Sequence, residues 1–273
     1  MEILVLMACG FYFLSAAGYL LYLIFQKDAL QRAGFYLLLT GFGCHTIALA
    51  MGWGQSGHMP VRNLYETLLV VAWAMAGAFL IFSCRSRMKI FGIYAAPFIT
   101  LVMIIATQVA RVPVSARPVF NSFWLIVHIL TIFLGEAALA LACGAGVLYL
   151  IQEQAIKTKS HGFFYKRLPS LDLLDGTGYA CLMTGFTLMT FGLVTGIIYA
   201  KSVWGRFWGW DPKEVWAGIT WLLYAALIHE RLTVGWRGRR SAILAIIGFA
   251  VIVFTFLGVN FFLHGHHGEF TRF

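Results

Sequence analysis

Histidines give the first sign of chemistry in this chain of 273 residues, which contains eight of them. His45 and His229 lie inside apolar stretches, where an ionisable side chain is costly and by default indicates a function. His128 lies near the start of another such stretch, and three histidines at 264–267 follow the last one. A neutral imidazole presents one nitrogen to a metal while a second partner orients the other. Histidines at helix ends therefore favour axial coordination of a flat metal cofactor, with hydrogen-bonded packing as the alternative.

Tryptophans gather in one segment, where five of the nine fall within eighteen consecutive positions. They are Trp204, Trp208, Trp210, Trp216 and Trp221. An interfacial aromatic belt is the ordinary explanation of tryptophan in a membrane protein, but a belt is shared among many helix ends. Concentration in one loop beside Gly205 and Gly209, which permit close backbone approach, favours a platform for a flat aromatic ligand.

A helix start follows these tryptophans directly. Asp211 as N-cap, Pro212 at the first helical position and Glu214 three residues after the cap together predict a capping box. Any ligand role of Asp211 would be additional to this structural one. Arg206 and Lys213 flank the segment, and we interpret them either as partners of ligand carboxylates or as solvated interfacial charges.

Membrane-spanning helices must position these residues. Hydrophobic residues make up 60% of the chain, charged residues 11%, and the mean hydropathy is +0.81, a balance foreign to water-soluble domains. A spanning helix needs roughly 20 apolar residues. The predicted spans are 2–25, 33–51, 64–83, 90–109, 122–151, 178–200, 212–229 and 242–263. The sequence thus predicts an all-α polytopic membrane protein of about eight transmembrane helices, with one domain over residues 1–273 and an outer loop at 201–215 leading into the seventh helix.

Lysine and arginine are more frequent in the connections on one side of these predicted helices. Because positive charge is retained on the cytoplasmic side, both termini and the 201–215 loop are predicted on the outer, periplasmic side. The formal net charge of +9 then reflects topology and contact with anionic membrane lipid, so no nucleic-acid partner is predicted. The five cysteines form no C-x-x-C pair, which argues against thiol redox chemistry on this chain.

Depth along the helices bears on which histidines share a ligand. At 1.5 Å per residue, His229 lies roughly 25 Å from the predicted start of its helix at Pro212, and His45 about 12 Å from the outer boundary of its own. Tilt or a helix break must reconcile these depths if the two form one pair. Glu136, eight residues after His128, orients a histidine, lines a polar path or makes a hydrogen bond across helices.

The longest motif carries a resemblance to a known family. The run 204–224, WGRFWGWDPKEVWAGITWLLY, resembles the WWD motif of the haem-handling protein superfamily. The segment 57–66, GHMPVRNLYE, and the tripeptide at 258–260, GVN, are similar to the CcsA/ResC branch, which belongs to the System II pathway of cytochrome c biogenesis. The resemblance covers nearly the whole chain.

This resemblance implies haem b as the cofactor and assigns ligands to its iron. His128 and His267 match two external axial ligands, and His45 and His229 match the transmembrane pair of a deeper haem site. His264 and His266 stay open as alternatives to His267. The other implied haem-binding residues are Trp204, Trp208, Trp210, Asp211 and Trp216.

The function implied by the resemblance is haem transport and presentation at the outer face of the bacterial cytoplasmic (inner) membrane. Haem would then be attached through thioether bonds to the C-x-x-C-H segment of apocytochrome c. The chain would be the CcsA-like subunit of a holocytochrome c synthase, together with a CcsB/ResB-like membrane subunit. Two alternatives stay open: a haem-binding chaperone or regulator without ligation, and a transporter or membrane cytochrome b that keeps its haem.

Overall fold

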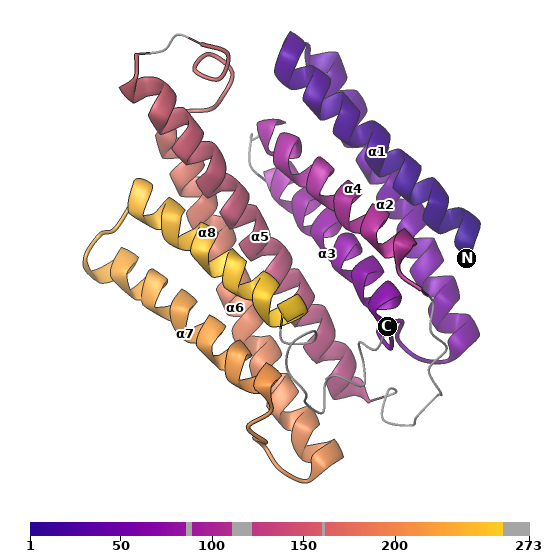
Figure 1. The fold of residues 1–273 in the computed structure, drawn as a ribbon. Helices are drawn as coiled ribbons and strands as arrows, with labels where there is room; N and C mark the ends of the chain where they lie inside the picture. The colour runs from indigo at the N-terminus through magenta and orange to yellow at the C-terminus, as the bar shows by residue number, and fades with distance from the viewer. Residues whose placement is uncertain (86–88, 111–121, 160–161, 259–273) are drawn as a thin grey trace. The chain divides into compact units, whose positions relative to one another are not determined.

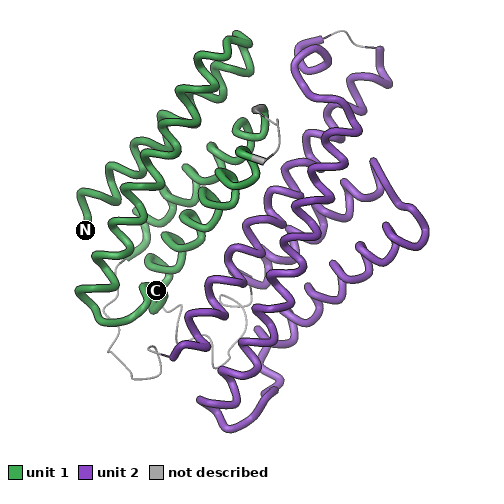
Figure 2. The backbone as a smooth tube through the Cα atoms, turned by 180° about the vertical axis from the view of Figure 1, so that it is seen from behind, with its two compact units in different colours: residues 1–121, 272–273 green, residues 122–271 purple. Residues whose placement is uncertain are grey.

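The computed structural model describes residues 1–85, 89–110, 122–159 and 162–258, which are mainly helical (Figure 1). These residues contain no β-strand. The chain divides into two compact units, built on residues 1–121 and 122–271 (Figure 2). Within these described ranges, six helices are long and apolar enough to cross a membrane. The predicted all-α polytopic membrane class is therefore confirmed, whereas the number of spans, the side of the termini and the single domain stay predictions.

The first unit begins with two long helices, α1 (Glu2–Phe25) and α2 (Asp28–Ser56), which pack together as a hairpin. It continues with α3 (Leu64–Arg85) and α4 (Gly92–Gln108), the latter entered through the 3₁₀ turn η1 (Lys89–Phe91). α4 packs on both α1 and α3. This unit positions His45, which lies on α2.

The second unit is built around the most extensive helix pair of the described residues, α5 (Phe123–Lys157) and α6 (Leu171–Trp204). α7 (Pro212–Thr233) and α8 (Arg239–Val253) complete it, and α8 continues as one π-helical turn, η3 (Phe254–Gly258). This unit carries the tryptophan segment, His128 and His229.

Glycines set the crossing of α5 and α6. A Cβ at Gly135 would lie 2.9 Å from the backbone nitrogen of Met189, and a Cβ at Gly185 would lie 2.8 Å from the carbonyl oxygen of Gly135. No side chain fits at those distances, so the two backbones touch. Small residues allow such close approach of membrane helices, and here it fixes the register of α5 against α6.

Several helices extend beyond their predicted spans, most clearly α6. The predicted span begins at residue 178, whereas α6 begins at Leu171, after Ser170 as its N-cap. The Ser170 hydroxyl accepts a hydrogen bond from the backbone N–H of Leu173 at 3.4 Å. α2 is likewise longer than its predicted span of 33–51. Hydropathy marks the apolar part of a helix, whereas its cap marks where it starts.

A largely buried ion pair joins α6, α7 and α8, with the Asp175 side chain 17% exposed. Arg231 of α7 makes two hydrogen bonds, of 2.9 and 2.6 Å, to the carboxylate oxygens of Asp175 on α6. Asp175 also accepts the backbone N–H of Gly238 at 2.9 Å, and Arg231 donates to the Ser241 hydroxyl at 3.1 Å. The Arg231 side chain is only 8% exposed. This pair holds the end of α7 and the start of α8 against α6.

Candidate functional site

The tryptophan loop, residues 205–211, connects α6 to α7 (Figure 1). α6 ends where Gly205 adopts a left-handed conformation, φ 72°, which glycine tolerates without strain. The Gly205 N–H donates to the Lys201 carbonyl at 3.1 Å, and the Lys201 ammonium donates back to the Gly205 carbonyl at 2.8 Å. The first residue of the loop is therefore fixed to the last turn of α6.

The predicted capping box fixes the other end of the loop. An Asp211 side-chain oxygen accepts the backbone N–H of Lys213 at 2.9 Å, and Oε2 of Glu214 accepts that of Asp211 at 3.3 Å. The same Glu214 oxygen also accepts the N–H of Gly209 at 2.7 Å. One carboxylate thus joins the loop to the first turn of α7. The structural role predicted for buried Asp211 is confirmed.

Trp210 has a backbone conformation that is rare for its residue type. Its φ is 57°, and a bulky non-glycine residue in that region costs about 1–3 kcal/mol. Its indole is 79% exposed and meets Trp208 edge to face, with ring centroids 6.0 Å apart. The hydrogen bonds at Gly209 and Asp211, on either side, hold the strained residue. Trp210 thus combines a strained backbone with an exposed side chain.

Each of the other tryptophans of the predicted site packs on a residue outside this pair. Trp208 is partly exposed, and its ring lies 3.6 Å from the position that a Cβ of Gly218 on α7 would take. Trp204 packs edge to face on Tyr199, and Trp216 packs on Phe254 of η3, with centroids 6.2 and 4.7 Å apart. We call the Trp208 and Trp210 indoles the aromatic platform, since Trp204 and Trp216 are more deeply packed beside it.

Trp221, the fifth of the group, has a packing role. Its Nε1–H donates to the Thr190 hydroxyl of α6 at 2.9 Å, and its ring stacks on Phe186, with centroids 5.5 Å apart. These contacts tie α7 to α6 within the helical layer. The five tryptophans therefore do not share one role: Trp208 and Trp210 form the platform, whereas Trp221 packs helices together.

Charged residues lie beside the aromatic platform. The Arg206 guanidinium folds against Gly209, 3.1 Å from the position that a Cβ of Gly209 would take. Lys213 in the first turn of α7 interacts electrostatically with Glu136 of α5. A basic residue of α7 and an acidic residue of α5 therefore lie within electrostatic range of each other.

His128 is seated against α6. Its Nδ1 donates to the Gly192 carbonyl at 2.7 Å, and a Cβ at Gly196 would lie 2.7 Å from the same nitrogen. Because a carbonyl only accepts, Nδ1 carries the hydrogen, and the neutral ring has its lone pair at Nε2. Along α6, Gly196 lies about 12 Å from Trp204 at the helix end. The second unit thus brings His128 and the tryptophan loop to the same end of α5 and α6.

His45 is fully buried in the first unit, with 0% of its surface exposed. Its Nδ1 lies 3.3 Å from the hydroxyl of Tyr12 on α1, whereas its Nε2 is buried without a hydrogen-bond partner among the described residues. Buried polar atoms are nearly always satisfied, so an orphaned imidazole nitrogen needs an explanation. Coordination of a metal through Nε2 is an explanation that fits the chemistry of the imidazole ring.

The remaining predicted ligands are less defined. His229 lies near the end of α7 with an exposed side chain, and its carbonyl accepts a hydrogen bond from the Thr233 hydroxyl at 2.7 Å. His45 belongs to the first unit and His229 to the second, so their pairing stays a prediction. His264, His266 and His267 lie outside the described residues.

Two sets of residues that hold the histidines were missed by sequence reasoning. Gly192 and Gly196, spaced four apart on α6, form the seat of His128, and this spacing of small residues was a usable signal. Tyr12 is separated from His45 by 33 residues, and nothing local marks it. Its role emerges only from the α1–α2 hairpin.

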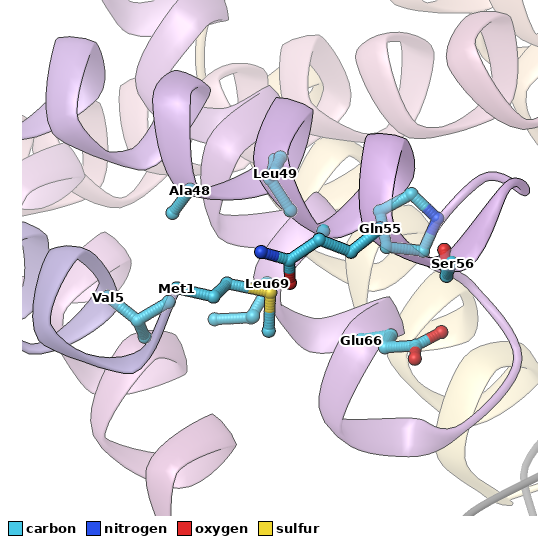
Figure 3. Close-up of a pocket in the computed structure, with 10 residues that line it drawn as sticks. Met1, Val5, Ala48, Leu49, Gln55, Ser56, Glu66 and Leu69 are labelled. Carbon is cyan, nitrogen blue, oxygen red and sulfur yellow. The ribbon is translucent and has the colours of Figure 1, made fainter.

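A cavity of about 240 Å³ lies in the first unit (Figure 3). Ala48, Leu49 and Gly52 line it, at three, four and seven residues beyond His45, and so share its face of α2. Its other lining residues are Met1, Val5, Gln55, Ser56, Pro60, Glu66 and Leu69. The cavity is thus one to two turns from His45, toward the Ser56 end of the helix.

Fold and site together define a polytopic helical membrane protein with an exposed aromatic platform, a histidine hydrogen-bonded to α6 and a buried histidine in the first unit. Residues 61–267 match the family described as cytochrome C assembly protein. The chain therefore belongs to this family, and its role lies in cytochrome c biogenesis.

Curated relatives agree with this assignment. The cytochrome c biogenesis protein CcsA of Prochlorococcus marinus (strain MIT 9312) is 36% identical over 245 residues, covering 81% of this chain and 79% of the relative. CcsA of Guillardia theta is 32% identical over 280 residues, covering 93% and 91%. The resemblance to the CcsA family found in the sequence is confirmed.

The fold is also similar to that of a solved structure. The cytochrome c heme lyase CcmF matches with a TM-score of 0.66 and 18% sequence identity. The match covers 98% of this chain and 48% of CcmF, so the chain spans about half the length of that protein. At this identity the likeness concerns the fold alone.

Proposed function

We propose that this chain receives haem b and presents it at the outer face of the cytoplasmic membrane for covalent attachment to apocytochrome c. The observation that carries the proposal is the geometry of the second unit. There, strained and exposed Trp210 lies at the same end of α5 and α6 as His128, whose Nδ1 is held by the Gly192 carbonyl. An exposed indole suits the face of a porphyrin, and an oriented imidazole suits its iron.

In this proposal His128 and His267 are the two axial ligands of the presented haem. The exposed Trp210 indole lies against the macrocycle, and Trp208 meets that indole edge to face. Arg206 and Lys213 are cations near the platform, suited to the haem propionates. Asp211 acts through its cap, since it fixes the start of α7 below the loop. Trp204, packed on Tyr199, and Trp216, packed on Phe254, lie in the helices on either side of the loop.

Haem is the substrate here, and its two vinyl groups are the atoms that react. Each cysteine thiol of a C-x-x-C-H segment adds across one vinyl double bond, so that sulfur bonds to one carbon and the thiol hydrogen passes to the other. No net oxidation or reduction is needed. The apocytochrome histidine replaces one of the axial imidazoles. The chain contributes by holding haem in position, which converts a collision into an oriented reaction.

A deeper haem site on His45, with His229 as the ligand that the family resemblance pairs with it, supplies the outer one. The orphaned Nε2 of His45 supports this assignment, since that atom is buried and lacks a partner among the described residues. A CcsB-like membrane subunit is the expected partner, and together the two chains form the synthase. Anionic lipid surrounds the helices.

The test is the absorption spectrum and haem content of the detergent-purified protein, coexpressed with a CcsB-like subunit. Wild type is expected to show a low-spin bis-histidine spectrum that His128→Ala and His267→Ala shift or abolish, and that added imidazole partly restores. His58→Gln is the matched control, because His58 is a buried histidine between α2 and α3 to which the proposal gives no ligand role. Haem-free wild type, or unchanged spectra in both variants, would overturn the proposal.

A second measurement, detection of the covalent haem–polypeptide product, distinguishes ligation from haem binding alone. The same preparation, given an unfolded apocytochrome with a C-x-x-C-H segment, is expected to yield haem that stays with the polypeptide after denaturation. Haem binding without that covalent product would favour a chaperone. A haem that is retained and cycles between redox states without transfer would favour a membrane cytochrome b.

A further inference from the structure

Tyr12 and His45 form a polar pair in the apolar interior of the first unit. Both side chains are 0% exposed, and the Tyr12 hydroxyl lies 3.3 Å from Nδ1 of His45. The rings meet edge to face, with centroids 5.9 Å apart and an interplanar angle of 65°. On the far side of the imidazole, Nε2 is buried and has no partner within the described part of the chain. The pair therefore directs one ring nitrogen away from the tyrosine hydroxyl.

Glycine on α2 holds the tyrosine in this place. A Cβ at Gly41 would lie 3.0 Å from both Cδ1 and Cε1 of Tyr12, so the ring lies flat against the α2 backbone. Tyr19, two turns further along α1, lies in the same way against Gly34, where a Cβ would be 3.0 Å from its Cδ2. Tyr19 packs on the ring of Phe79, with centroids 5.9 Å apart. Two tyrosines thus share one packing scheme, but Tyr12 meets an imidazole where Tyr19 meets a phenyl ring.

We propose that Tyr12 is a positioning residue for His45 as an iron ligand, and that it accepts the Nδ1 hydrogen when Nε2 binds haem iron. The inference rests on the proposed function. A phenol both donates and accepts, so it follows the ring in either tautomer. Without iron, the Tyr12 hydroxyl donates to Nδ1 and the ring hydrogen lies on Nε2. With iron at Nε2, the hydrogen moves to Nδ1 and the hydroxyl accepts it.

This arrangement differs from that of His128. There the partner is the Gly192 carbonyl, which only accepts and so holds one tautomer. A carbonyl suits a ligand that is kept ready for iron, whereas a hydroxyl suits a ligand that alternates between loaded and empty states. His45 with Tyr12 therefore has the chemistry of a site that takes up haem and passes it on.

Electronic consequences follow from the hydrogen bond. An imidazole whose N–H is accepted by oxygen is a stronger donor to iron, which favours the ferric state. Tyr12→Phe keeps the ring and its packing but removes the acceptor. We expect the midpoint potential of the His45 haem to rise and its haem affinity to fall roughly 10-fold.

The experiment uses the full chain coexpressed with its CcsB-like subunit and carrying His128→Ala, so that the deeper haem dominates the spectrum. Tyr12→Phe is compared with Tyr19→Phe, which removes the same atom from the same helix. Redox titration gives the midpoint potential, and transfer to an excess of a soluble apo-haem protein gives relative affinity. Tyr12→Phe is expected to shift both quantities, and Tyr19→Phe neither. Gly41→Ala, which displaces the Tyr12 ring, is expected to shift them in the same direction.

His45→Ala separates the inference from the function on which it rests. If His45→Ala removes the deeper haem while Tyr12→Phe matches Tyr19→Phe in potential and affinity, the positioning role is wrong and the haem site stands. If His45→Ala leaves that haem unchanged, the deeper site and the role of Tyr12 are both wrong. Size-exclusion profiles of each variant show that folding is retained.

Discussion

His128 of α5 and Gly192 of α6 are joined across 2.7 Å by a hydrogen bond from Nδ1 to the carbonyl oxygen. The bond connects the candidate ligand to the helix that ends in the tryptophan loop. Ring orientation and loop position therefore depend on the same element. A change in α6 that moves the ring is expected to affect haem without touching any ligand.

Gly196→Ala tests this dependence. The added methyl would lie 2.7 Å from Nδ1 of His128, so the ring must move away from Gly192. We expect a weakened low-spin spectrum that added imidazole partly restores. Gly176→Ala on the same helix is the control, because its new methyl would have no described atom within 4 Å beyond its chain neighbours and the nearby backbone of its own helix. Equal spectra for the two variants would show that the contact of His128 with Gly192 and Gly196 does not affect haem binding.

Trp210→Gly is expected to separate stability from function. Glycine adopts φ 57° without strain, so the variant should unfold at an equal or higher temperature, with a gain of up to about 1 kcal/mol. Haem retention should fall, because half of the aromatic platform is lost. Gly205→Ala is the opposite case: it places a side chain at φ 72° and should lose about 1 kcal/mol. Thermal unfolding in detergent and haem content measure both; a destabilised Trp210→Gly would contradict the strain argument.

Glu214→Ala should loosen the tryptophan loop. It removes the acceptor of the Gly209 and Asp211 N–H groups, which is expected to cost about 1 kcal/mol. Glu214→Gln keeps an accepting oxygen and is the matched control. Hydrogen exchange of the loop amides is the direct measurement. Faster exchange in Glu214→Ala alone is expected, and equal exchange in both variants would contradict a role for the second bond of the capping box.

Asp175→Leu should be the most destabilising of these changes. It leaves the Arg231 guanidinium, 8% exposed, without its carboxylate, and breaking a buried pair costs about 3–5 kcal/mol. Glu153→Gln is the comparison, since its Lys157 partner is 58% exposed and such pairs contribute about 0–1 kcal/mol. Thermal unfolding of each, and of Asp175→Leu with Arg231→Met, measures the difference. The double variant is expected to recover much of the loss; no recovery would mean that the ion pair does not cause it.

Local signals in the sequence predict the capping box and the membrane helices, because both depend on short spacings. The cap of α7 needs only Asp211 and Glu214 in order, and the structure confirms it. The predicted span 178–200 covers only the apolar part of α6, which begins at Leu171. The acidic residues Asp172 and Asp175 belong to the same helix, and Asp175 is paired there by Arg231 from far along the chain.

Long-range partners could not be predicted. No sequence pattern near His45 indicates Tyr12 as its partner, and none near His128 indicates Gly192, since each partner comes from another helix. The family resemblance supplied the histidines as candidates but not their tautomers. Those depend on whether a hydroxyl or a carbonyl faces the ring, which only the packing of helices decides.

The Glu214 carboxylate spans the tryptophan loop and the first turn of α7 in the chain alone. The loop therefore loses its conformational entropy when the protein folds. Binding of a ligand to the loop does not include this free-energy cost. For the same reason the loop stays ordered when the ligand dissociates. If haem binds there, its rate of departure should follow the exchange of axial ligands, with little dependence on loop motion.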